Sequence, residues 1–164
     1  MKSPWSHLHD TLEKQRKGYD HLYKLLKKKE KELISGNTRK LQVILRDEEK
    51  YINELDRLEN ERMKATAACT SEANVKTTLK EMLSLAPEAE RQRLESAAMG
   101  LMETLNAVAA LNRTNAELIK ESMNFVGYNI NLFSSDRRLD NMYGESGRVL
   151  GAEPRIRGIV NREA

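Results

Sequence analysis

The chain has 164 residues, of which 39% are hydrophobic, 32% charged and 5% aromatic, and its formal net charge is +3. This length corresponds to one domain, on a prior of roughly 150 residues per domain. Eight glycines and three prolines are too few for the frequent turns of a β-sandwich or barrel, so the composition excludes an all-β fold.

Cysteine content and apolar runs bear on the compartment. A single cysteine, Cys69, excludes an intramolecular disulfide and is typical of a reducing environment. No run approaches the roughly 18 apolar residues of a membrane span, and Met1–Ser6 lacks the apolar region of a secretory signal. We therefore expect a cytoplasmic protein with no integral membrane segment.

The first predicted helix spans residues 4–34. Ser3 is a candidate N-cap, and Pro4 suits the first helical position because no hydrogen bond is needed from its nitrogen. A stripe with alternating spacings of four and three follows, made of Leu8, Leu12, Gln15, Tyr19, Leu22, Leu26, Lys29 and Leu33. Gly36 is a C-terminal stop signal, and Asn37 or Thr38 is the expected N-cap of the next helix.

The second predicted helix spans residues 38–68 and has one apolar side. Acidic and basic residues balance on its outer face, a pattern typical of solvated helix surface that indicates no chemistry. Because the connection to the first helix is so short, we expect the two helices to form an antiparallel hairpin.

Two more helices complete the prediction. A short helix over residues 72–84 follows the capping candidates Thr70 and Ser71, and a long helix over residues 87–134 begins at Pro87. The sequence therefore predicts an all-α fold, an antiparallel helical bundle with coiled-coil-like packing.

The apolar surface of the long helix widens toward its C-terminal end. One heptad-like series comprises Leu94, Ala98, Leu101, Leu105, Val108, Ile119, Val126 and Phe133, and a second series beside it comprises Leu111, Leu118, Phe125 and Leu132. Two antiparallel helices are sufficient to cover the first series. The second needs another partner, which is the chain's own tail, a second subunit or a client, and a wide apolar surface of this kind is typical of an interaction site.

Two asparagines, Asn112 and Asn115, fall in phase with the first series. A buried amide must find a hydrogen-bond partner and so disfavours other alignments of the helices. We predict that these residues specify the register of the bundle.

The composition changes after the long helix. Residues 136–164 contain four of the eight glycines and only scattered apolar residues, so they bury too little surface to order themselves alone. We predict a single helical domain over residues 1–135, followed by a tail that is flexible or packed against a partner.

Residue types that catalyse reactions or bind metals do not form a recognisable site. His7 and His9 are two residues apart on a helix, so they point to different sides and lack a second histidine at i+4. Cys69 lacks a neighbouring cysteine or cationic cluster, and acids such as Glu59 and Glu61 lie on the charged helix face. We predict no catalytic residue, no metal site, no cofactor and no enzymatic activity.

The one basic cluster runs from Lys24 to Lys31 and is interrupted by Glu30. A nucleic-acid footprint needs a more strongly basic domain with an uninterrupted basic face. We therefore expect no nucleic-acid partner.

Three motifs resemble the FlgN family of bacterial flagellar export chaperones. The segment LNRTNAELIKESMNFV, from Leu111 to Val126, resembles the family's LNxxNxxLIxxSLxFV stretch, with Met123 in place of a leucine. Met142–Gly147 resembles the YGxxG motif that follows it, and Ile159–Ala164 resembles the closing motif of the family. The order of the predicted helices is also similar to that of the family.

The resemblance implies a cytoplasmic chaperone of the flagellar type III secretion system. Such a chaperone binds the terminal helices of hook–filament junction proteins, prevents their premature assembly and delivers them to the export gate and its ATPase complex. The resemblance assigns client binding to Leu111, Leu118, Ile119, Ser122, Phe125, Val126, Leu132 and Phe133. It assigns docking at the export gate to Tyr143, Gly144 and Gly147.

A structural coiled-coil or adaptor protein without a secretion client explains the N-terminal helices equally well. The sequence leaves open which junction protein is bound, and whether the chain is a monomer or a homo-oligomer, because the tail or a second subunit completes the bundle equally well.

Overall fold

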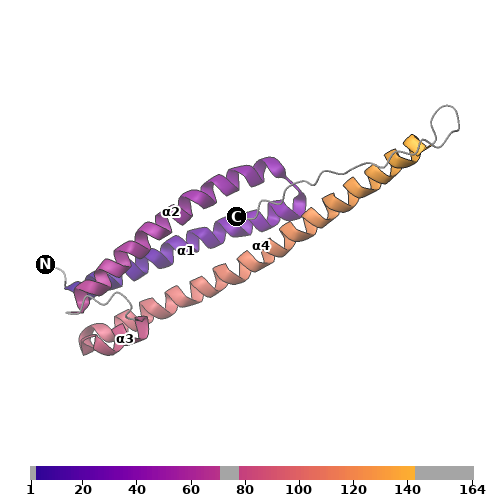
Figure 1. Cartoon of the computed structure of the whole chain (residues 1–164). Coiled ribbons are helices and arrows are strands. Elements are labelled where there is room, and N and C mark those ends of the chain that lie inside the picture. Colours follow the sequence, from indigo (N-terminus) through magenta and orange to yellow (C-terminus); the bar gives the residue numbers. More distant parts are fainter. Residues whose placement is uncertain (1–2, 71–77, 143–164) are drawn as a thin grey trace. The chain divides into compact units, whose positions relative to one another are not determined.

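A computed structural model of the chain describes residues 3–70 and 78–142 (Figure 1). The described residues contain four helices and no strand, which confirms the predicted all-α fold: α1 (Pro4–Ser35), α2 (Thr38–Cys69), α3 (Leu79–Leu85) and α4 (Glu88–Met142). None of the helices in these two ranges combines the length and apolar character that a membrane span requires.

Local signals set the ends of the first two helices as the sequence predicts. The Ser3 hydroxyl accepts a hydrogen bond from the Ser6 backbone nitrogen at 3.1 Å and so caps α1. Gly36 ends this helix with a φ of 68°, a left-handed conformation that costs glycine little. The Asn37 side chain then accepts from the Lys40 backbone nitrogen at 3.1 Å and caps α2.

The predicted start of the short helix was wrong. Thr78 has an extended backbone and is the N-cap of α3, so the helix begins at Leu79 rather than at residue 72. Thr78 and Glu81 form a reciprocal capping box, and the sequence signal for it, T-x-x-E before an apolar residue, is present in the chain. Thr70 lies at the C-terminal end of α2, and residues 71–77 lie outside the described residues.

The long helix also extends further than expected, to Met142 rather than to residue 134. Ser134 and Ser135 suggested a break, but the residues that follow, such as Arg137 and Leu139, have high helix propensity. Residues 143–164, the remainder of the predicted tail, lie outside the described residues.

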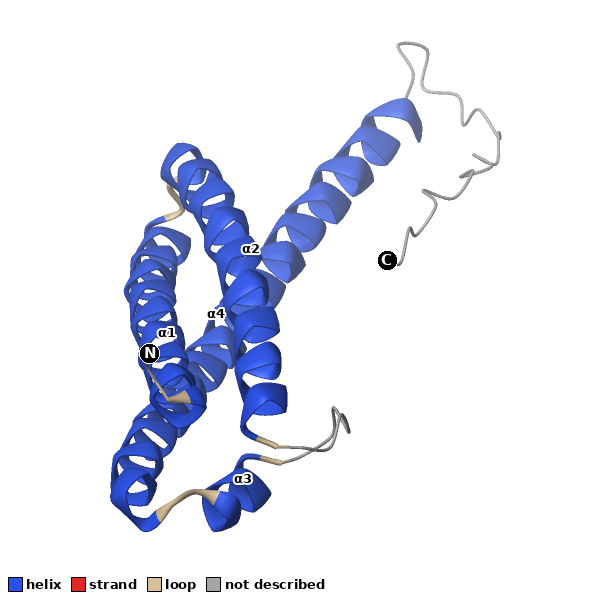
Figure 2. Cartoon of the chain, turned by 90° about the vertical axis from the view of Figure 1, so that its left-hand side faces the viewer, coloured by secondary structure: helices blue, strands red, loops and turns tan. Residues whose placement is uncertain are grey.

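The chain divides into two compact units, residues 1–120 (unit 1) and residues 121–164 (unit 2). The core of unit 1 has two clusters, to which α1, α2 and the N-terminal half of α4 all contribute. The first contains Leu8, Leu12, Ala65, Met82, Ala86, Leu94, Ala97 and Leu101, and the second contains Leu22, Leu26, Leu55, Leu58, Val108 and Leu111. Figure 2 shows the short turn that joins α1 to α2 and the loop between α3 and α4.

Within unit 1, α4 runs parallel to α1. Ser3 bonds Glu90 at a separation of 87 residues, and Asn115 bonds Leu26 at a separation of 89 residues. Because this difference in residue number is nearly constant along both helices, the two helices run in the same direction. Since α1 and α2 pair as a hairpin, α2 is antiparallel to both of the others.

Two polar contacts join α1 to α2 inside the hairpin. The Gln15 amide nitrogen donates to Glu59 at 2.8 Å, and the Lys29 ammonium lies 2.8 Å from Glu48 in a pair whose side chains are only 11% and 15% exposed. The expectation that the acids of α2 are simply solvated was therefore wrong for Glu48, whereas the Glu59 side chain is 46% exposed. Gln15 and Lys29 occupy the stripe of α1, and each needs a polar partner because the stripe is buried.

The two asparagines of α4 behave differently. Asn115 is only 2% exposed, and its side-chain nitrogen donates to the backbone oxygen of Leu26 at 3.1 Å. This contact supports the predicted role of Asn115 in helix register. Asn112 is exposed, so it does not contribute a buried hydrogen bond of this kind.

We expect Asn115→Ala to lower the free energy of unfolding by about 1–2 kcal/mol, through loss of the hydrogen bond and the small cavity that remains. Asn112→Ala is the matched control and should change it by less than about 0.5 kcal/mol, because its side chain is exposed. Urea denaturation of both variants measures this difference, and equal effects would contradict the register role of Asn115.

Candidate protein-binding surface

The helical part of unit 2 carries large apolar side chains that are mostly exposed. They are Met123, Phe125, Val126, Tyr128, Ile130 and Leu132. Phe125 is 67% exposed, and neither of the core clusters found among the described residues includes a residue beyond Leu111. A run of exposed apolar side chains on one helix is typical of a surface that binds another protein.

These side chains form two rows on the helix. Met123, Val126 and Ile130 follow one another at spacings of three and four, and so do Phe125, Tyr128 and Leu132. At about 100° per residue, the two rows lie about 160° apart around the helix axis. We call the six side chains from Met123 to Leu132 the C-terminal apolar surface, and each of its two rows suits an amphipathic helix rather than a small ligand.

Sequence reasoning found part of this surface and missed the rest. Phe125, Val126 and Leu132 were predicted, whereas Met123, Tyr128 and Ile130 were not. The spacing of Met123 and Ile130 from Val126 was a usable signal, because residues three and four apart share a helix face.

The other predicted client-binding residues have different environments. Leu111 is only 6% exposed and packs in the second core cluster with Leu22 and Leu26, so it is a core residue of unit 1. Leu118 is half-buried and Ile119 is 37% exposed, and both lie near the end of the same unit. Ser122 is exposed in unit 2.

The remaining predicted site residues lie outside the part of the structure that is described. This applies to the side chain of Phe133 and to the whole of Tyr143, Gly144 and Gly147. Their assignments remain predictions.

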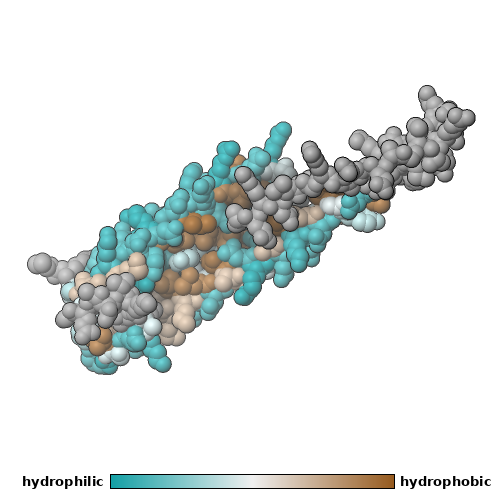
Figure 3. All heavy atoms as spheres, in the orientation of Figure 1, coloured by the Kyte–Doolittle hydropathy of each residue, from teal (hydrophilic) through white to brown (hydrophobic). Residues whose placement is uncertain are grey.

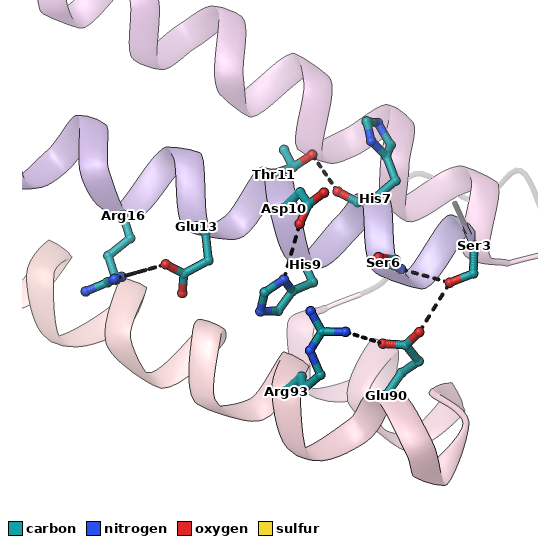
Figure 4. Close-up of polar contacts among 10 residues, drawn as sticks. All are labelled: Ser3, Ser6, His7, His9, Asp10, Thr11, Glu13, Arg16, Glu90 and Arg93. Carbon is teal, nitrogen blue, oxygen red and sulfur yellow. Dashed lines mark hydrogen bonds and ion pairs between the residues drawn. The ribbon is translucent and has the colours of Figure 1, made fainter. Parts of the chain in front are cut away.

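The two histidines at the start of α1 do not form a site together. Figure 4 shows His7 and His9 pointing to different sides of the helix. The His9 ring lies 3.5 Å from Asp10, and the backbone oxygen of His7 accepts a hydrogen bond from Thr11 at 2.9 Å. Within the described ranges, no group of three or more metal-binding side chains comes together.

Charged residues in unit 1 are arranged for packing. Glu59 accepts hydrogen bonds from Arg62 and from Gln15, and these bonds lower the pKa of its carboxyl, the Arg62 bond most strongly. A lowered pKa keeps the carboxylate ionised at neutral pH, which suits an inter-helix contact and does not suit a general acid.

Comparison with known proteins identifies the relatives of this chain. The family model described as FlgN protein matches residues 5–151. A protein of Bacillus subtilis (strain 168) named "Uncharacterized protein YvyG" is 29% identical over 110 residues, which cover 66% of this chain and 67% of that protein. No solved structure matches the chain.

The cysteine has the properties of a structural residue. Cys69 is half-buried at the end of α2 and packs against the first core cluster. Burial raises the pKa of its thiol to about 11. Because the thiolate is the nucleophile, a raised pKa makes this cysteine unreactive at neutral pH.

We expect iodoacetamide to alkylate Cys69 at pH 8 at least about 100-fold more slowly than an exposed thiol, since far less thiolate is present. A Cys69→Ser/Ser84→Cys variant supplies the comparison, because Ser84 is exposed. The Cys69 rate should rise about tenfold per pH unit up to about pH 10. A rate that levels off below pH 9 would contradict the raised pKa.

Proposed function

The chain belongs to the FlgN family, a family of flagellar chaperones, and from this premise we propose that it is an export chaperone for hook–filament junction proteins. It acts in the cytoplasm, binds the terminal helices of these clients, prevents their premature assembly and delivers them to the flagellar type III export gate. The observation that carries the proposal is the C-terminal apolar surface, from Met123 to Leu132.

Client binding follows the physics of a helix docked on an apolar face. Amphipathic terminal helices of a client lay their apolar sides on the two rows, one of which contains Phe125 and the other Val126 and Ile130, and burial of these side chains supplies the affinity. No nucleotide or cofactor is required, because the chaperone only has to cover a surface that would otherwise aggregate. Leu118, Ile119, Ser122, Leu132 and Phe133 remain proposed contacts of the same helices, whereas Leu111 is left out as a core residue.

We expect Phe125→Ala to weaken binding of a junction-protein terminal peptide by about 1–3 kcal/mol, the usual cost of truncating an aromatic anchor. Met99→Ala is the matched control. Met99 is also a large, exposed apolar residue of α4, 64% exposed against 67% for Phe125, but it lies in unit 1. Isothermal titration calorimetry with the peptide should show no change for this control.

Two results would contradict the assignment of Phe125. Equal loss in both variants would indicate non-specific apolar adsorption. Loss of folding in Phe125→Ala, measured by circular dichroism, would indicate a core residue. A fixed oligomer that does not respond to junction proteins in light scattering would instead favour the structural adaptor.

Docking at the export gate is a separate step, which we assign to Tyr143 with Gly144 and Gly147. Tyr143→Ala should leave client affinity unchanged, and it should reduce capture of the client complex by the cytoplasmic part of the gate. Met99→Ala removes an exposed side chain outside the C-terminal apolar surface and should leave gate capture unchanged. Pull-down with the purified gate domain measures both, and unaltered capture of the Tyr143 variant would refute the assignment.

A further inference from the structure

The net positive charge at the end of the α1–α2 hairpin exceeds the net charge of the whole chain. Residues 24–50 contain nine lysines and arginines against five acids, a balance of +4, whereas the complete chain has a net charge of +3. This segment includes the turn at Gly36. The rest of the chain is therefore close to neutral.

Only part of this charge is used for structure. Lys29 pairs with Glu48 inside the hairpin, and Lys27, Lys40 and Lys50 also have carboxylates within 4.0 Å. Five cations remain for which no ion pair is found in the described part of the chain: Lys24, Lys28, Lys31, Arg39 and Arg46.

The unpaired cations lie in two rows. Lys24, Lys28 and Lys31 recur at spacings of four and three, so they share one face of α1. Arg39 and Arg46, with Val43 between them at the same spacings, share one face of α2. The hairpin thus carries a row of positive charge on each of its two helices.

A hollow of about 430 Å³ lies between the two helices at this end, and Lys28 and Arg39 both line it. Leu25 and Ile44 line it as well and are buried, whereas Val43 is 57% exposed and lines it from α2. We call this site the basic hollow. The basic hollow has an apolar lining and a basic margin. It lies within unit 1 and shares no residue with the C-terminal apolar surface.

We infer that the basic hollow docks an acidic amphipathic segment of a partner protein. An aliphatic side chain of that segment enters beside Val43, and its carboxylates pair with Lys28 and Arg39, so that the apolar contact gives affinity and the charges give orientation and a fast on-rate.

The hollow favours a protein over a polyphosphate. Glu32 and Asp47 also line it, so its margin is not the continuous row of positive charge that a polyphosphate binds. The apolar lining gives a phosphate backbone nothing to bind, whereas an amphipathic helix uses both the lining and the margin. Figure 3 shows hydrophobic residues gathered between hydrophilic ones on the face of unit 1 that it draws.

A defined probe tests the inference on the full chain. The probe is a fluorescein-labelled 18-residue helical peptide of leucine and glutamate with leucines at helix spacing, and its counterpart has glutamine in place of every glutamate. Fluorescence anisotropy at about 50 mM salt should show at least about tenfold tighter binding of the acidic peptide, and added salt should weaken it.

Charge-matched variants locate the binding. Lys28→Glu/Arg39→Glu should weaken binding of the acidic peptide by about tenfold or more. Lys14→Glu/Lys64→Glu makes the same change in net charge at exposed residues outside the hollow and should weaken it by less than about twofold. Val43→Gln changes no charge and should also weaken binding, because it replaces the exposed apolar contact in the hollow.

Several outcomes would overturn the inference. Equal losses in the two double variants would mean that only overall charge matters, and equal binding of the two peptides would mean that charge does not matter. Tighter binding of duplex DNA or of phosphatidylserine vesicles than of the acidic peptide, lost in Lys28→Glu/Arg39→Glu, would assign the hollow to nucleic acid or to membrane. Circular dichroism confirms that each variant is folded.

Discussion

The alignment of α4 with α1 is the constraint on which the rest of unit 1 depends. The Ser3–Glu90 and Asn115–Leu26 hydrogen bonds set this alignment at separations of 87 and 89 residues. It brings Val108 and Leu111 of α4 into one core cluster with Leu22 and Leu26 of α1. Neither core cluster found among the described residues includes a residue of unit 2.

Large apolar side chains of α4 continue into unit 2 and are exposed there. The helix carries them as far as Ile130 and Leu132, whereas Leu111 is the last residue of α4 in the core clusters of unit 1. Exposed Phe125 and Val126 bring no stability to unit 1, so packing gives no reason for the sequence to keep them. A client helix supplies the missing partner in the proposed function, and the apolar rows then have the role that Leu22 and Leu26 of α1 have in the core.

Much of the fold was predictable because its signals are local. Ser3, Gly36 and Asn37 define the hairpin through their caps, and each is recognisable in the sequence. The sequence did not predict which of Asn112 and Asn115 is buried. A straight helix drifts by about 20° per heptad relative to an exact seven-residue repeat, so residues of one predicted series come to lie on different faces. Phe125 and Val126 were found from the spacing of apolar residues, whereas spacing alone does not say whether an apolar residue is buried in the core or exposed.

Polar residues in the hairpin serve either its folding or its surface. Gln15 and Lys29 interrupt the stripe of α1, and each takes an acid from α2, so two acids and one cation are used to align the hairpin. Lys28, one residue away, faces the basic hollow and has no part in that alignment. We therefore expect changes at Lys28 and Arg39 to destabilise the fold less than changes at Lys29, which would leave a buried carboxylate without its partner. Because the basic hollow selects by charge and the C-terminal apolar surface by buried area, a client and a second partner need not compete for the same residues.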